Sequence, residues 1–253
     1  MRKITINLAA VAAFCIVVAS PALVSSSCAT PKTEQEDTTI IREDSGITAL
    51  KYSSPEVPAS IEFCGKTIDL SRFDRHERMD RELLAFTYMH STSLQMLKKA
   101  NRYFPIVEPI LKENGIPYDF KYLMVIESNM NPTARSSAGA AGLWQFMQGT
   151  GRDYGLEVNN NVDERYHIEK ATRAPCRYLK DAYAKYKDWV AVAASYNAGQ
   201  ARIASQLAKQ DVDDSLDLQL VEETARYVYR ILAAKQLFNA PTTFGFRLRA
   251  SDL

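Results

Sequence analysis

The chain has 253 residues, 46% of them hydrophobic, and its 31 Lys and Arg nearly balance its 30 Asp and Glu. A near-neutral chain lacks the positive surface that nucleic-acid binding requires, so a nucleic-acid partner is excluded. The same balance suits a polymer that is recognised through hydrogen bonds and stacking rather than through charge.

The first 27 residues have the layout of a secretory signal. Arg2 and Lys3 form a basic start, and an almost unbroken apolar run from Leu8 to Ala19 follows. The run is too short and wrongly flanked for a membrane-spanning helix, which is the alternative interpretation. We therefore expect residues 1–27 to be removed on export to the periplasm, which leaves 29 basic and 30 acidic residues.

Cys28 directly follows this signal, at the position where a lipoprotein carries its lipid. Lipoprotein signals usually place an aliphatic residue three positions before the cysteine, and this chain has Ser25 there. Attachment to the outer membrane through a lipidated Cys28 and a soluble exported protein are therefore both open.

Composition divides the rest of the chain into four parts. Residues 28–60 are rich in Thr, Ser, Glu, Asp and Pro and predict a flexible tether. Residues 61–100 predict an N-terminal helical extension, residues 101–240 the main domain, and residues 241–253 a tail too short to fold alone. The part after the tether, about 190 residues, suffices for one domain with a sizeable core.

Hydrophobic periodicity predicts an all-α domain. We expect helices over 74–103 (with a break near 91–93), 106–113, 119–127, 142–153, 167–186, 188–209 and 219–238. No stretch alternates enough to require a large sheet, and only a short ribbon near 156–166 is allowed.

Cys64 and Cys176 are the cysteines that remain in the predicted domain. An oxidising compartment permits a disulfide between them, and two separate buried thiols are the other interpretation. The three histidines lack metal-ligand spacing, so neither a metal nor a cofactor is expected.

Glu127 is the candidate catalytic residue. It directly follows the apolar run Leu123–Ile126, and desolvation there should raise its pKa. A carboxylic acid that stays protonated near neutral pH can act as a general acid on a leaving oxygen. A glutamate at a helix end that is simply exposed to water is the alternative.

The residues after Glu127 favour a site for a sugar. A stretch of small residues from Ser136 to Ala141 keeps bulk away from the carboxylate. Trp144 and Gln145 then fall in the first turn of the helix predicted to start at Gly142; a Trp face packs on a sugar ring, and a Gln amide donates and accepts.

Four strings in this order resemble the lytic transglycosylases of family 1, and more narrowly the membrane-bound lytic murein transglycosylase D group. They are Glu127-Ser128, the nine residues from Gly139 to Met147, Ser195-Tyr196-Asn197-Ala198-Gly199, and Glu223-Thr224-x-x-Tyr227-Val228. The resemblance covers about residues 100–235 and implies a single lysozyme-like helical domain. It implies cleavage of the β-1,4 bond between N-acetylmuramic acid and N-acetylglucosamine in peptidoglycan strands, with a 1,6-anhydromuramyl end as product.

The resemblance also implies roles for individual residues. Glu127 matches the catalytic acid, which protonates the glycosidic oxygen and then takes the proton of the C6 hydroxyl. Tyr196 matches a tyrosine that hydrogen-bonds this acid, while Glu223 and Tyr227 are expected to support the site. The remaining positions expected to bind substrate are Ser136, Trp144, Gln145, Met147 and Asn197.

Some positions depart from the family pattern. Gln148 stands where a proline is common, and Arg226 lies one position later than the arginine of the fourth motif, which puts its role in doubt. Asp163 and Arg165 are interpreted as charges that brace a loop. A hydrolytic muramidase on the same fold and an idle glycan-binding scaffold remain the rival interpretations.

Overall fold

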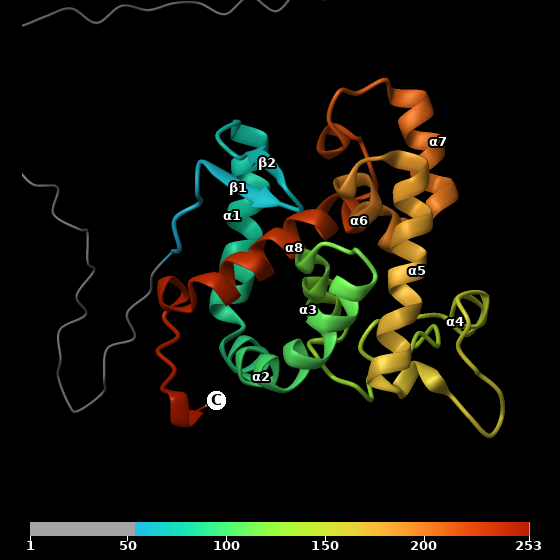
Figure 1. Ribbon diagram of the computed structural model, residues 1–253. Coiled ribbons are helices and arrows are strands. Elements are labelled where there is room, and N and C mark those ends of the chain that lie inside the picture. Colours follow the sequence, from blue (N-terminus) through green and yellow to red (C-terminus); the bar gives the residue numbers. More distant parts are fainter. Residues whose placement is uncertain (1–53, 253) are drawn as a thin grey trace, which may run out of the picture. The chain divides into compact units, whose positions relative to one another are not determined.

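The structure, a computed structural model, describes residues 54–252 (Figure 1). The predicted signal over 1–27, Cys28 and the part of the predicted tether up to residue 53 lie outside the described residues. The helices are α1 (Phe73–Tyr88), α2 (His90–Glu113), α3 (Lys121–Ser128), α4 (Gln148–Asp153), α5 (Ile168–Tyr186), α6 (Trp189–Ala198), α7 (Gln200–Gln210) and α8 (Glu222–Asn239). Short 3-10 turns are η1 (Tyr118–Phe120), η2 (Glu164–Tyr166), η3 (Ser215–Asp217), η4 (Pro241–Phe244) and η5 (Ala250–Asp252).

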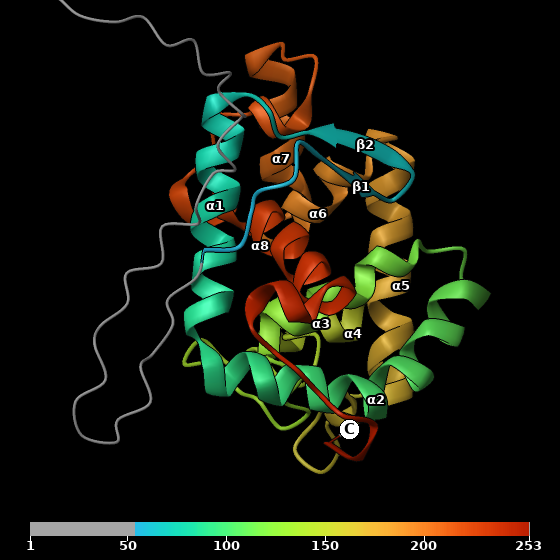
Figure 2. The same cartoon turned by 90° about the vertical axis from the view of Figure 1, so that its left-hand side faces the viewer.

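The predicted all-α class is confirmed in the described part of the chain, where α8 is the central helix. It packs against α1, α3 and α6, and Figures 1 and 2 show it crossing the middle of the described unit. Ile231 and Leu232 of α8 are completely buried. Helix α6 is central for a different reason: half of its buried residues are alanines, which permit close approach to α5 and α8.

A small antiparallel hairpin precedes the helices, formed by β1 (Ser60–Phe63) and β2 (Lys66–Asp69) with Ser60 opposite Asp69. Cys64 and Gly65 form its turn, both with positive φ (54° and 84°), the geometry of a tight two-residue hairpin turn. The prediction of a tether to residue 60 followed directly by a helical extension from 61 is therefore wrong at this point. The extension begins with a hairpin, and Val57 before it is already buried.

Lys235 of α8 attaches this hairpin to the helical core. Its ammonium group donates to the backbone carbonyl of Glu62 at 2.6 Å and to the Asp119 carboxylate at 2.9 Å. The other Asp119 contact is the backbone N–H of Cys64, at 2.7 Å. A buried lysine is tolerated here because carboxylates neutralise it; the charge pattern of the sequence does not show this pairing.

Helix boundaries differ from the predicted ones where backbone geometry overrides periodicity. The break in the first predicted helix falls at Met89, and α2 then continues through Pro105 and Pro109 to Glu113. The predicted helix over 188–209 is divided at Gly199, whose φ of 84° ends α6 and begins α7. The predicted helix over 142–153 is reduced to α4, because residues 142–147 form a turn. The ribbon allowed near 156–166 is a single bridge between Val158 and Asp163.

Within residues 54–252, no helix combines the length and apolar character needed to cross a bilayer.

Candidate active site

Glu127 lies in the last turn of α3, directly after four buried apolar residues. The helix ends because Asn129 and Met130 both adopt the left-handed conformation, with φ of 50° and 56°. The side chain of Glu127 is thus held at the edge of the core, partly buried, by a short and rigid element.

Tyr227 of α8 is the direct partner of Glu127. Its hydroxyl donates a hydrogen bond to the Glu127 carboxylate, and its ring is only 3% exposed. Burial raises the pKa of Glu127 to about 7, while the Tyr227 hydrogen bond and the positive charge of Arg230 act in the opposite direction. The nearby carboxylate of Glu223 adds to the increase. Glu127 can therefore hold or release a proton near neutral pH.

Asn197 joins the end of α6 to the start of α8 beside this carboxyl group. Its amide oxygen accepts from the Thr224 hydroxyl at 2.8 Å, and its amide nitrogen donates to Glu223 at 3.4 Å. The third and fourth sequence strings, about 27 residues apart, thereby meet next to Glu127. Glu223 itself is exposed at the surface.

Tyr196 does not hydrogen-bond Glu127, so that prediction is wrong. Its hydroxyl donates to the backbone carbonyl of Trp144 at 2.8 Å, and its ring stacks on Phe146 at 5.7 Å between centroids. It remains near the acid, since the charge of Glu127 contributes to raising the pKa of Tyr196. Tyr227, which was expected only to support the site, contacts Glu127, and Tyr196 instead holds the loop.

That loop, residues 134–147, folds back on itself through bridges from Ala141 to Arg135 and to Phe146. The Ser136 hydroxyl accepts from the backbone N–H of Ala140 at 3.0 Å. Gln145, itself at a φ of 49°, donates its amide to the carbonyls of Ala134 (3.2 Å) and Gly142 (2.8 Å). The Gln145 amide is therefore occupied in holding the turn together, and it is not free to donate to a substrate as predicted.

Gly142 and Arg165 fix this loop in place. Gly142 has a φ of 78°, and a Cβ there would lie 1.9 Å from the carbonyl oxygen of Arg165, so no other residue fits. The buried Arg165 guanidinium donates to the carbonyls of Gly139 (2.8 Å) and Phe146 (2.9 Å) and pairs with Asp163 at 2.7 Å. The interpretation of Asp163 and Arg165 as bracing charges is confirmed.

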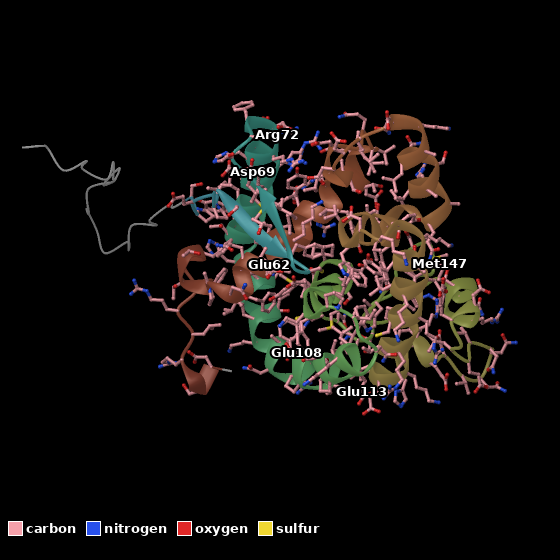
Figure 3. The ribbon with its side chains drawn as sticks, turned by 45° about the horizontal axis from the view of Figure 1, so that its top comes forward. Glu62, Asp69, Arg72, Glu108, Glu113 and Met147 are labelled. Carbon is pink, nitrogen blue, oxygen red and sulfur yellow. The ribbon has the colours of Figure 1, made fainter. Side chains whose placement is uncertain are left out.

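Trp144 requires a correction. Its side chain is 1% exposed, and its indole N–H donates to the Thr172 hydroxyl of α5 at 3.1 Å. The ring is a core residue and cannot stack on a sugar. The reason is the turn over residues 142–147, which directs this side chain inward where a helix would have placed it differently. Met147 has the opposite position: it is 45% exposed at the surface (Figure 3).

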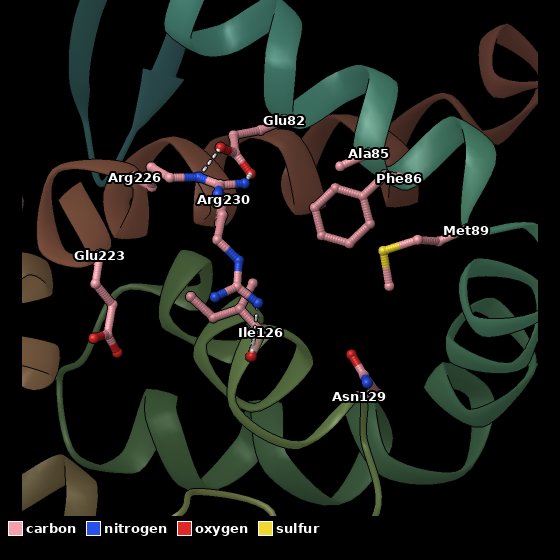
Figure 4. Close-up of a pocket in the computed structure, with 9 residues that line it drawn as sticks. All are labelled: Glu82, Ala85, Phe86, Met89, Ile126, Asn129, Glu223, Arg226 and Arg230. Carbon is pink, nitrogen blue, oxygen red and sulfur yellow. Dashed lines mark hydrogen bonds and ion pairs between the residues drawn. The ribbon is translucent and has the colours of Figure 1, made fainter.

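A pocket of about 310 Å³ is lined by residues of α1 and α8 and by Ile126 and Asn129, which flank Glu127 along the chain (Figure 4). Its charged groups include Arg226, which pairs with Glu82 at 2.7 and 3.2 Å, and Arg230, which donates to the carbonyl of Ile126 at 3.2 Å. The sequence analysis did not identify Glu82 or Arg230. Glu82 could have been noticed, because a 3.6-residue repeat places it on the apolar face of α1 between Met79 and Phe86.

Cys64 and Cys176 are both free thiols in the structure, so the disulfide left open by the sequence is absent. Cys64 lies in the hairpin turn, and Cys176 is buried in α5 with its thiol directed to the Thr172 carbonyl at 3.2 Å. Burial raises the pKa of both thiols, to about 11 for Cys176. Over residues 54–252 there is also no cluster of three or more His, Cys, Asp or Glu that could hold a metal ion.

Comparison with known proteins gives one family and several relatives. Residues 105–217 match the family described as Transglycosylase SLT domain. The membrane-bound lytic murein transglycosylase D of Escherichia coli K12 is 29% identical over 181 residues, which cover 70% of this chain and 39% of the relative. The peptidoglycan transglycosylase gp16 of Escherichia phage T7 is 30% identical over 138 residues, 52% of this chain and 10% of the relative. The chain thus spans well under half the length of these curated relatives.

Among solved structures, the 70 kDa soluble lytic transglycosylase of Escherichia coli is 21% identical with a TM-score of 0.49, over 59% of this chain and 26% of that one. A complex of the 70 kDa soluble lytic transglycosylase with bulgecin A gives the same values. A lytic transglycosylase from Pseudomonas aeruginosa gives a TM-score of 0.47 at 21% identity, over 58% of this chain and 26% of that one.

Proposed function

We propose, on the premise of the match between residues 105–217 and the Transglycosylase SLT domain, that the chain cleaves the β-1,4 bond between N-acetylmuramic acid and N-acetylglucosamine in peptidoglycan. The observation that carries the proposal is the setting of Glu127. Its carboxyl group lies at the edge of the core, receives the Tyr227 hydroxyl, and has a pKa raised to about 7. Such a group can serve as acid and then as base at one pH.

The reaction that we propose needs these two states in turn. Protonated Glu127 donates its proton to the glycosidic oxygen, and the electron pair of the breaking bond to C1 stays on that oxygen. The C6 hydroxyl oxygen of the same sugar then bonds to C1, and its proton passes to the Glu127 carboxylate. A 1,6-anhydromuramyl end results, no water is consumed, and the enzyme is again protonated. Tyr227 would stabilise the carboxylate between the two steps.

A single carboxyl group suffices for this sequence of steps, whereas most hydrolases use a second one about 5–9.5 Å from the first. Glu223 is the second carboxyl group whose charge acts on Glu127, but it is exposed and its hydrogen-bond partner is Asn197. We assign it the supporting role of holding Asn197 at the end of α6. Ser136 and Met147 keep their proposed roles as substrate contacts on the loop beside the acid.

The test is to digest purified peptidoglycan with the chain from residue 28 onward and to weigh the soluble fragments by mass spectrometry. We expect anhydromuramyl fragments, none with Glu127→Gln, and the same products at a reduced rate with Glu223→Gln. Fragments heavier by one water that vanish with Glu223→Gln would replace the transglycosylase with a hydrolytic muramidase. Binding without any fragments, from the unaltered chain as well, would leave only a glycan-binding scaffold.

We further propose that the enzyme works in the periplasm, in cell-wall turnover, after loss of residues 1–27. The curated relative from Escherichia coli is itself named membrane-bound. A lipid on Cys28 would attach this chain to the outer membrane. The mass of the N-terminal peptide from exported protein, compared with that of Cys28→Ala, would distinguish a lipidated from an unmodified N-terminus.

A further inference from the structure

The pocket beside Glu127 has a wall that the SLT match does not include. Ala85 and Phe86 of α1, together with Met89 directly after it, form an apolar side, and α1 and α8 both lie outside residues 105–217, which the family match covers. The opposite side is α8 with Arg226 and Arg230 (Figure 4). At about 310 Å³, the pocket is at the lower end of the range of ~300–1,000 Å³ for ligand sites, which suits one side group of a polymer rather than a whole chain.

The two arginines of the pocket are in different electrostatic states. Arg226 is neutralised by Glu82, a carboxylate only 2% exposed, through both of its oxygens. Arg230 has a backbone carbonyl, that of Ile126, as its hydrogen-bond partner. Among the described residues no carboxylate lies within 4.0 Å of the Arg230 guanidinium group, while its remaining N–H groups are available to a ligand.

Arg230 lies close to Glu127. It follows Tyr227 by three residues on α8, so the two side chains project from the same face of the helix. Its charge acts on the pKa of Glu127, and its partner Ile126 directly precedes that residue. In Figure 4, Glu223 is drawn on the other side of Arg230 from Asn129 and Met89.

We propose that this pocket is a subsite for the acidic branch of the amino sugar next to the scissile bond, with Arg230 binding its carboxylate. The inference rests on the proposed function. The lactyl branch of N-acetylmuramic acid ends in a carboxyl group, which is free in a bare glycan and extended by an acidic peptide in a substituted one. Its methyl group fits the apolar side formed by α1, and guanidinium–carboxylate pairing supplies the charge-assisted contact. Arg226 and Glu82 form the fixed back of the subsite.

The test measures binding by titration calorimetry in the inactive Glu127→Gln protein, so that no effect of Arg230 on the acid can contribute. The probes are a tetrasaccharide of alternating N-acetylglucosamine and N-acetylmuramic acid with free lactyl carboxylates, and the same sugar with these groups converted to carboxamides. We expect the carboxylate form to bind about tenfold more tightly, as one charge-assisted contact gives. In the double variant Glu127→Gln/Arg230→Gln this difference should disappear.

Control variants separate the charge from the fold. Arg230→Lys in the same background should keep a preference for the carboxylate, and Arg247→Gln, which removes an exposed arginine near the C-terminus, should keep all of it. A tetrasaccharide that carries acidic peptides distinguishes the two sources of the carboxylate. If Arg230→Gln weakens binding only of the sugar that carries peptides, the subsite binds the peptide carboxylate. If it weakens binding of the bare sugar, the subsite binds the lactyl carboxylate.

Two outcomes would overturn the subsite. One is equal binding of the carboxylate and carboxamide sugars to Glu127→Gln, and the other is an equal weakening of both by Arg230→Gln. Digestion of peptidoglycan by the unaltered chain, run in parallel, separates the two proposals. Fragments from the unaltered chain together with either outcome would refute the subsite alone, whereas absence of fragments and of any sugar binding would refute the proposed function with it.

Discussion

Replacing Glu127 by Gln should make the protein more stable at pH 8 and leave its stability at pH 4 unchanged. The reason is that burial raises the pKa of Glu127 from an ordinary value of 4.5 to about 7 in the folded state. Below the unfolded value the group is protonated in both states and has no effect. As the pH rises from 4.5 to about 7, the unfolded chain ionises more readily than the folded one, so the free energy of unfolding decreases.

The size of the stability change follows from the difference between the unfolded and folded pKa values of Glu127. One pKa unit corresponds to about 1.36 kcal/mol, so complete ionisation of Glu127 costs the folded state ~3 kcal/mol at most. Because the side chain is only partly buried, solvent screening should reduce the cost to about 2 kcal/mol. A glutamine is neutral, has nearly the same shape and still accepts the Tyr227 hydroxyl, so it should avoid this cost without loss of packing.

Urea unfolding of both proteins at pH 4, 5, 6, 7 and 8, followed by circular dichroism, measures the effect. The difference in the free energy of unfolding between Glu127→Gln and the unaltered protein should grow from near zero at pH 4 to about 2 kcal/mol and level off above pH 7. Glu77→Gln, which replaces an exposed carboxylate on α1, is the control and should change stability by less than ~0.5 kcal/mol throughout. A difference for Glu127→Gln that is the same at every pH would refute the reasoning, since it would mean that Glu127 is solvated like a surface residue.

Three further predictions follow from the contacts of the site. Tyr227→Phe removes a hydrogen bond that lowers the pKa of Glu127, so the alkaline limb of the pH–rate profile should move upward by about one unit; an unchanged limb would contradict the assignment. Trp144→Phe should cost ~1–3 kcal/mol of stability in urea unfolding, through lost packing and its indole hydrogen bond, with KM unchanged; a higher KM at unchanged stability would restore a role in binding sugar. Arg226→Ala leaves the buried carboxylate of Glu82 with Arg81 alone, at 3.2 Å, so it should destabilise the fold by about 1–2 kcal/mol, and adding Glu82→Gln should recover part of this in a double-mutant cycle.

The setting of Glu127 at the end of an apolar helix could be predicted from the sequence because it depends on local features. An apolar run of one short helix ends at Glu127, which the sequence shows directly, and Asn129 and Met130 then take left-handed backbone in the structure. Most helices could be predicted in the same way, because a hydrophobic repeat of 3.6 residues is visible within each helix and does not depend on what the helix packs against. It failed at residues 142–147, where positive φ at Gly142 and Gln145 turned an expected helix into a turn and directed Trp144 into the core.

The partners of the acid could not be predicted in the same way. Tyr196 and Tyr227 lie on different helices, and each is about 70 to 100 residues from Glu127 along the chain. The hydrophobic pattern of the sequence does not show which of the two tyrosines lies beside Glu127. The packing of α8 against α3 and α6 decides that Tyr227 donates to the carboxylate and that Tyr196 donates to the loop.

The sequence by itself predicted the all-helical class, Glu127 as the candidate acid, the small-residue loop and the strings that resemble the lytic transglycosylases. Only the tertiary structure decided which tyrosine hydrogen-bonds Glu127 and that Glu82 neutralises Arg226. It alone also placed the Arg230 guanidinium in a pocket that α1 partly forms. The physical reason is that backbone conformation and amphipathicity follow from neighbouring residues. Hydrogen bonds and ion pairs between distant residues depend on how whole helices pack, and desolvation of a carboxyl group depends on every element that covers it.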